Sequence, residues 1–140
     1  MIGIIEVYGS MLLRALGQTL LLTLLSLLFA MVIGMIFGLM NVGHNRVLNL
    51  IGTIYVDAVR GVPLIVLAYF IYFGVPAGMQ GLGFASFRLN ALQAGTAALS
   101  MNCGAYMAEI IRAGIESVDR GQMEAARSLG LSYSSSMALV

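Results

Sequence analysis

The sequence predicts an all-α protein that crosses a membrane several times. Hydrophobic residues make up 60% of the 140 residues, charged residues only 9%, and the mean hydropathy is +0.96. A soluble globular domain carries about 25% charged residues, so this chain lacks the side chains that would cover a water-facing surface. This composition excludes an ordinary soluble enzyme, a disordered protein and a nucleic-acid-binding protein, which would also need a basic patch.

Three long runs without a charged residue predict three transmembrane helices. The runs from Arg14 to Arg46, from Arg60 to Arg88 and from Arg88 to Glu109 enclose 31, 27 and 20 residues. A helix needs about 20 such residues to cross a hydrocarbon core of ~30 Å. We therefore expect membrane-spanning helices at about 19–41, 54–75 and 89–110.

The distribution of arginine predicts that the N-terminus lies outside the cell. In that orientation loop 42–53 and segment 111–140 face the cytoplasm, and five of the seven arginines are on the inside. Such an excess agrees with the positive-inside rule. Residues 1–18 are then an external N-terminal segment, and residues 19–140 form the transmembrane domain. The first apolar run is too long for a cleaved signal peptide.

Small residues at helical spacing predict close packing between the spans. Gly34 and Gly38 form a GxxxG step in the first span, and Ser100, Gly104 and Ala108 form a ridge in the third. In lipid, small residues let helix backbones approach closely. Packing is the main interpretation of the first span, and lining a pathway is the alternative.

Polar side chains in the third span could serve packing or transport. Asn102 lies near the middle of the membrane, where an amide needs a partner on another helix or a water-filled cavity. Contact with other helices and contact with a substrate both remain open for this residue. Glu109 can form an ion pair with Arg112 at spacing i+3, and Asp57 and Arg60 have the same spacing.

A charged segment after the third span predicts an exposed helix-turn-helix. Asp119 can cap a helix over 120–129, with Gln122 at the third helical position as in a capping box. Gly130 would end this helix, and Ser132 could cap the next one. From these residues alone, the segment is either a docking element or a solvated loop.

This segment carries a family resemblance. Glu124-Ala-Ala-Arg-Ser-Leu-Gly-Leu131 resembles the EAA loop of the membrane subunits of binding-protein-dependent ABC importers. Further blocks resemble the polar amino-acid branch of this family, at 102–115, Gly121-Gln122, 60–65, and Thr19-Leu20 with Thr23-Leu24. Val62 stands where that branch commonly has Thr. The resemblance covers about residues 15–140.

The resemblance implies a fold, partners and site residues. It implies the type I ABC-importer transmembrane fold, incomplete at the C-terminus because family members continue into further spans. It also implies a multi-pass protein of the bacterial plasma (inner) membrane, which is not itself an enzyme and carries no metal. The implied partners are ATP-binding subunits that hold ATP and Mg, a second permease subunit, an external solute-binding protein and an amino-acid substrate. By the same resemblance, Glu124, Ala125, Ala126 and Gly130 dock the ATP-binding subunit. Asn102 is our candidate substrate contact.

Two other functions are compatible with the composition. One is a permease of another ABC branch, for peptides or inorganic ions, which the Tyr106–Glu109 block disfavours. The other is a small structural membrane protein or channel that acts alone, which the docking-like segment disfavours. An intramembrane enzyme is not supported, because one His, one Cys and no HExxH or GxSxG leave no catalytic set.

Overall fold

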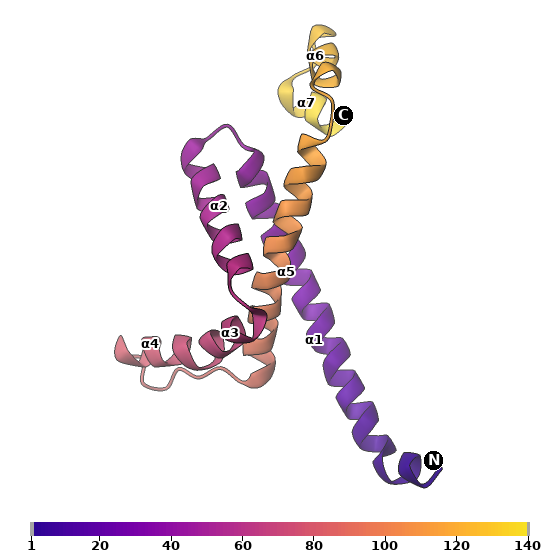
Figure 1. Cartoon of the computed structure of the whole chain (residues 1–140), viewed down its shortest axis with the longest axis vertical. Helices are drawn as coiled ribbons and strands as arrows, with labels where there is room; N and C mark the ends of the chain where they lie inside the picture. The colour runs from indigo at the N-terminus through magenta and orange to yellow at the C-terminus, as the bar shows by residue number, and fades with distance from the viewer. Residues whose placement is uncertain (1, 140) are drawn as a thin grey trace.

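The computed structural model describes residues 2–139, and every regular element in that range is helical. Two long helices, α1 (Ile2–Val42) and α5 (Ala91–Glu116), cross each other, and α2 (Arg46–Gly61) packs against both (Figure 1). The remaining elements are short: α3 (Leu64–Tyr69), the π-helical segment η1 (Phe70–Gly74), α4 (Val75–Gly81), α6 (Arg120–Ser128) and α7 (Tyr133–Leu139). The all-α prediction is confirmed.

Helix α1 is longer than the span that the sequence predicts. It has 41 residues and is continuous across the expected boundary between an external segment 1–18 and a span 19–41. At 1.5 Å per residue it extends about 60 Å, roughly twice the thickness of a hydrocarbon core. Its first turns project away from the other helices (Figure 1). Span length follows membrane thickness, whereas a helix continues wherever its backbone is hydrogen-bonded and no proline interrupts it.

Small residues bring α1 and α5 into close contact. Gly104 of α5 lies so near α1 that a methyl group at its position would come within 2.7 Å of Ile33 Cγ2. A methyl group at Gly34 of α1 would lie 2.5 Å from Met107 Cβ. Ala30 and Ala108 are fully buried at this contact. The expected packing role of the GxxxG step and of the ridge on the third span is confirmed.

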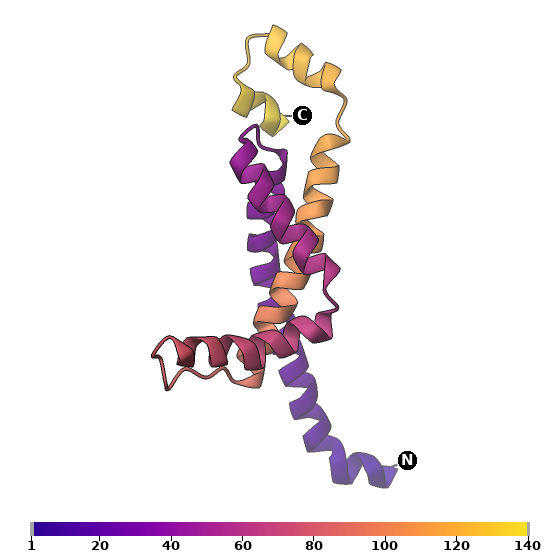
Figure 2. The same cartoon turned by 60° about the vertical axis from the view of Figure 1, so that its left-hand side comes forward.

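The predicted span 54–75 is not one helix. Helix α2 ends at Gly61, and Val62 adopts an extended conformation with φ −103° and ψ 130°. Pro63 follows, and its ring sterically disfavours a helical conformation in the residue before it. The Pro63 carbonyl then accepts from the amides of Val66 and Leu67 at 2.9 and 3.1 Å, which starts α3. Helices α3 and α4 run across the long axis of the molecule (Figure 2).

The segment after α3 widens into a π-helix before a second proline. Residues 70–74 are π-helical, and Pro76 lies in the first turn of α4. A proline ring within a helix clashes with the carbonyl four residues earlier. One wider turn at this point moves that carbonyl away and lets the helix continue to Gly81.

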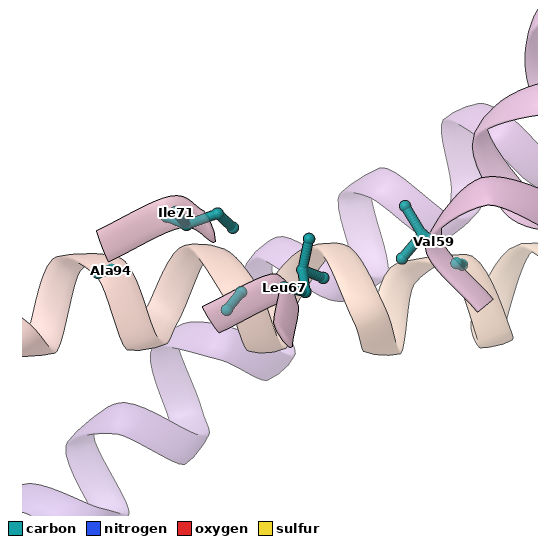
Figure 3. Packing of buried hydrophobic residues seen from close by; sticks show 6 residues of the cluster. Val59, Leu67, Ile71 and Ala94 are labelled. Atoms are coloured by element: carbon teal, nitrogen blue, oxygen red, sulfur yellow. The ribbon is translucent and has the colours of Figure 1, made fainter. Parts of the chain in front are cut away.

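A short row of apolar side chains holds α3 and η1 against α5. Leu67 and Ile71 are 8% and 6% exposed, and they belong to one buried cluster with Ala94 and Ala98 of α5. Val59 of α2 continues the row along α5 (Figure 3). This cluster fixes the crosswise segment to the same helix that carries the polar residues of the predicted third span.

Helix α5 begins close to the predicted span 89–110 and continues six residues beyond it. Asn90 and Gln93 form a reciprocal capping box at its start. Within the described chain, Tyr8–Val42 and Leu64–Gly81 are the two helical stretches long and apolar enough to cross a membrane. Helix α5 is long enough but more polar, because it carries Gln93 and Asn102. The three spans and the outside N-terminus stay predictions.

Candidate functional site

Local hydrogen bonds define α6 as a separate short helix. Asp119 is its N-cap, and its carboxylate accepts from the amide of Gly121 at 2.7 Å. The expected reciprocal bond from Gln122 is not formed among the described residues, so this is a simple cap rather than a capping box. The carboxylate accepts from the amide of the second helical residue and not from that of the third.

A glycine turn ends α6 as predicted. The helix ends at Ser128, one residue before the expected end, and Gly130 has φ +86°, a conformation that side chains with a Cβ rarely adopt. The amide of Leu131 donates to the carbonyl of Ala126 at 3.3 Å across the turn. Ser132 then caps α7, because its hydroxyl accepts from the amide of Ser135 at 3.2 Å.

The predicted docking residues lie on an exposed surface at one end of the bundle. Glu124, Ala125 and Gly130 are exposed, Ala126 is half-buried, and Leu129 is 83% exposed. Helix α6 packs against α7, and both lie at the end opposite the start of α1 (Figure 1). A short capped helix with two alanines on it presents little bulk, so another protein surface could approach its backbone closely.

A large open cavity separates this helix pair from the bundle. Its volume is about 960 Å³, and it lies between the α1–α2 loop, the end of α5, α6 and α7. His44 of the loop meets Tyr133 of α7 edge to face, with ring centroids 6.0 Å apart. His44 is exposed and lies in the bend between α1 and α2. Glu124 and Met123 line the cavity from α6.

A charged network lies on the neighbouring part of α5. Glu109 accepts from two nitrogens of Arg112, which confirms the predicted ion pair at spacing i+3. Arg112 also donates to Glu116 at 2.7 Å. The hydrogen bond to the Glu109 carboxylate raises the pKa of Arg112 above its usual value, so this guanidinium keeps its charge.

Arg60 connects α2 to this network. Its guanidinium nitrogen lies 3.8 Å from Glu109 Oε2, and its Cζ lies 5.2 Å from the centre of the Tyr106 ring. The sequence does not predict this contact, because the spacing i+3 indicates Asp57 as the neighbour of Arg60. Within the described residues, Arg60 forms the one ion pair between two different helices.

Asn102 does not join these groups. It is half-buried on α5 and makes no side-chain hydrogen bond among the described residues, so the partner expected for it is not found there. The neighbouring carbonyl of Met101 accepts from the hydroxyl of Tyr55 at 2.8 Å. One turn further along α5, Tyr106 is 48% exposed and lies beside Arg60.

Residues 30–139 match the protein family described as the binding-protein-dependent transport system inner membrane component. The chain belongs to this family. The family is a permease component of transporters located at the inner membrane, and this agrees with the prediction that the chain is not itself an enzyme.

Individual permeases resemble the chain over most of its length. It is 41% identical over 128 residues to the probable glutamine ABC transporter permease GlnM of Bacillus subtilis, covering 91% of this chain and 56% of that protein. It is 36% identical over 126 residues to the arginine transport system permease ArtQ of the same organism, covering 90% and 55%. The chain thus spans about half the length of these relatives.

A solved structure shares the fold. A crystal structure of an amino acid ABC transporter with histidines superimposes with a TM-score of 0.80 at 37% identity, covering 95% of this chain and 59% of that one. This similarity confirms the predicted ABC permease fold. The family match over residues 30–139 includes α6 and α7, so the exposed helix pair lies within the part of the chain that the family shares.

Proposed function

We propose that this chain is the membrane-spanning permease subunit of an ATP-driven importer for polar amino acids. The observation that carries the proposal is the exposed α6 with its Gly130 turn, at one end of a bundle that matches the permease family over residues 30–139. The relatives above are named for glutamine and arginine transport, and this supports an amino acid as substrate.

The proposed subunit is a multi-pass protein of the bacterial inner membrane, with three spans and its N-terminus outside. Large apolar side chains on α1 and on the α3–η1 segment support this placement, since Leu13, Leu24, Ile65 and Phe70 are each more than 60% exposed. A monomeric soluble protein rarely exposes so much contiguous apolar surface. A lipid bilayer, or further helices within it, would cover these side chains.

ATP would act on this chain through separate partner subunits. Separate ATP-binding subunits would hold ATP and Mg, and their closure would move α6 through contacts at Glu124, Ala125, Ala126 and Gly130. Helix α6 follows α5 after a three-residue link, so its displacement would tilt α5 together with the tightly packed α1. Rigid-body motion of this kind opens a transport path alternately to the two sides of a membrane.

The remaining partners follow from the same proposal. A second permease subunit would complete the path, and an external solute-binding protein would deliver the amino acid at the end where α1 begins. Asn102 is half-buried and lacks a side-chain partner among the described residues. This supports its proposed role as a substrate contact on the path, because an amide within a membrane is costly unless it is hydrogen-bonded.

Substitution of Ala126 by arginine tests the docking role. In the assembled importer, Ala126→Arg should lower ATP-driven amino-acid uptake at least about tenfold, because a bulky charge at a docking contact disrupts the interface. The ATP-binding subunits should no longer co-purify, while the amount of permease in the membrane stays unchanged. Ala126→Ser keeps a small side chain and should behave as wild type.

Other outcomes separate the alternatives. Normal uptake by the Ala126→Arg variant would refute the docking role. Failure of the wild-type chain to co-purify with any ATP-binding subunit would favour a membrane protein that acts alone. Uptake that peptides or inorganic ions inhibit, and amino acids do not, would place the chain in another importer branch.

A further inference from the structure

A polar cavity of about 300 Å³ lies between the C-terminal end of α1, α2 and the C-terminal part of α5. Eight of its nine lining residues are polar or charged. The five charged ones come from two helices, with Asp57 and Arg60 on α2 and Glu109, Arg112 and Glu116 on α5. We call this space the Arg60 cavity. Charged side chains are costly in an otherwise apolar bundle unless they pair with one another or bind a ligand.

The charges on α5 largely satisfy one another. Arg112 donates to both Glu109 and Glu116, so its guanidinium is held by two carboxylates of its own helix. These contacts follow from helical spacing and need nothing from α2. The α5 side of the cavity is therefore a fixed wall with one excess negative charge.

The charges on α2 are much less satisfied. Among the described residues Asp57 forms no ion pair, and Arg60 reaches Glu109 only at 3.8 Å. This distance is longer than a charge-assisted hydrogen bond of about 2.7–2.9 Å. Asp57 and Arg60 are one helical turn apart and face the same space. An unpaired carboxylate thus lies near a guanidinium that has room for a second partner.

A third polar residue lines the cavity from α1. Asn41 at the end of α1 is only 7% exposed. Its side-chain oxygen is buried and packs on Gly52 of α2, where an added methyl group would overlap it. Asn41 therefore closes the α1 side of the cavity with a side chain that α2 holds in place.

We propose that the Arg60 cavity binds the zwitterionic head group of an α-amino acid. The α-carboxylate would pair with Arg60, and the ammonium would pair with Asp57. The inference rests on the proposed function. It adds a second amino-acid-binding site on the transport path, which lies nearer to α6 than Asn102 does. Asn102 does not line this cavity. Charged residues at membrane depth commonly mark the route of a substrate.

Cysteine protection tests the site directly. Thr53 lines the cavity and is exposed, so Thr53→Cys places a thiol there after the native Cys103 is replaced by serine. The importer, purified with its partner subunits, is alkylated with a maleimide in the presence of L-glutamine or L-arginine. We expect either amino acid to slow alkylation of residue 53, and its α-methyl ester to give no protection, because the ester lacks the carboxylate.

Charge variants connect that protection to the named residues. Arg60→Gln and Asp57→Asn should each raise the half-protecting amino-acid concentration about tenfold or more, the loss expected for one charge-assisted contact. Arg46→Gln lies on the same helix outside the cavity and should leave protection unchanged. Equal alkylation rates without amino acid in wild type and variants would show that the cavity itself is intact.

The outcomes distinguish this inference from the function on which it rests. If the wild type takes up amino acids with ATP but residue 53 is never protected, the cavity proposal is wrong. The proposed importer function is then unaffected. Protection that survives Arg60→Gln, or that the ester provides equally well, overturns the proposal too. If no amino acid is taken up at all, the proposed function itself fails.

Discussion

Helix α5 meets its two neighbours in different ways. Toward α1 it presents Gly104 and Ala108, and the two backbones are so close that an added methyl group would overlap the other helix. Toward α2 it presents Tyr106 and Glu109, which reach Arg60 across a polar cavity. The first contact is made of close-packed small residues, whereas the second combines apolar packing at Val59 with longer polar side chains.

The difference concerns how each contact responds to movement. Van der Waals packing weakens steeply once surfaces separate, so α1 and α5 must move as one body or come apart. Ion pairs between partly exposed side chains weaken gradually, and their flexible stems can follow a small shift. We infer that α1 and α5 form the rigid part of this bundle, and that α2 is the element whose position can be adjusted.

The largest effect should follow from a single methyl group at the rigid contact. Gly104→Ala would place a Cβ 2.7 Å from Ile33 Cγ2 and 2.9 Å from Ile33 Cβ, where a β-branched side chain has little freedom to move. Overpacking of this kind costs about 1–3 kcal/mol. Thermal unfolding of the purified protein in detergent should show the loss.

Gly114 provides the matched control on the same helix. A methyl group there meets nothing within 4 Å, and alanine is the better helix former by about 1 kcal/mol. Gly114→Ala should therefore leave the unfolding temperature unchanged or raise it. If both alanine variants unfold like the wild type, the close packing of α1 on α5 is wrong.

A smaller loss is expected between α2 and α5 at Tyr55. Its hydroxyl donates to the carbonyl of Met101 at 2.8 Å, while its ring stacks on Phe37 with centroids 3.9 Å apart. Tyr55→Phe removes the hydrogen bond and keeps the stacking, so the free energy of unfolding should fall by about 1 kcal/mol. A change as large as that of Gly104→Ala would contradict the ranking of the two contacts.

The smallest effect is expected for the ion pair between Arg60 and Glu109. Their side chains are 37% and 31% exposed, and pairs of this kind contribute less than about 1 kcal/mol. A double-mutant cycle with Arg60→Gln and Glu109→Gln measures the coupling between them. A coupling above about 3 kcal/mol would mean that the pair behaves as a buried one and that α2 is fixed rather than adjustable.

Local features of this chain could be predicted from its sequence. The Asp119 cap, the Gly130 turn and the Ser132 cap each depend on residues within a few positions of one another, and all three are formed. The ion pair between Glu109 and Arg112 belongs to the same class. Such interactions need only a correct local backbone, which the residue types themselves favour.

Features that depend on tertiary structure could not be predicted in the same way. Whether Arg60 lies nearer to Asp57 or to Glu109 depends on how α2 crosses α5, and spacing along one helix contains no information on that. The break at Val62–Pro63 was missed for another reason. The count of uncharged residues between Arg60 and Arg88 measures hydrophobicity, whereas the break comes from the missing amide and the ring of Pro63.

The 41-residue length of α1 has a mechanical consequence. The first turns of α1 bend away from the rest of the helix (Figure 2), so a tilt of one degree about its C-terminal end displaces its N-terminal part by less than about 1 Å. Because α1 is packed tightly on α5, a small rotation delivered near α6 would arrive at the opposite end of α1 as an enlarged sideways stroke. The close glycine contact would therefore pass the tilt of α5 on to α1 without loss, and the length of α1 would enlarge it.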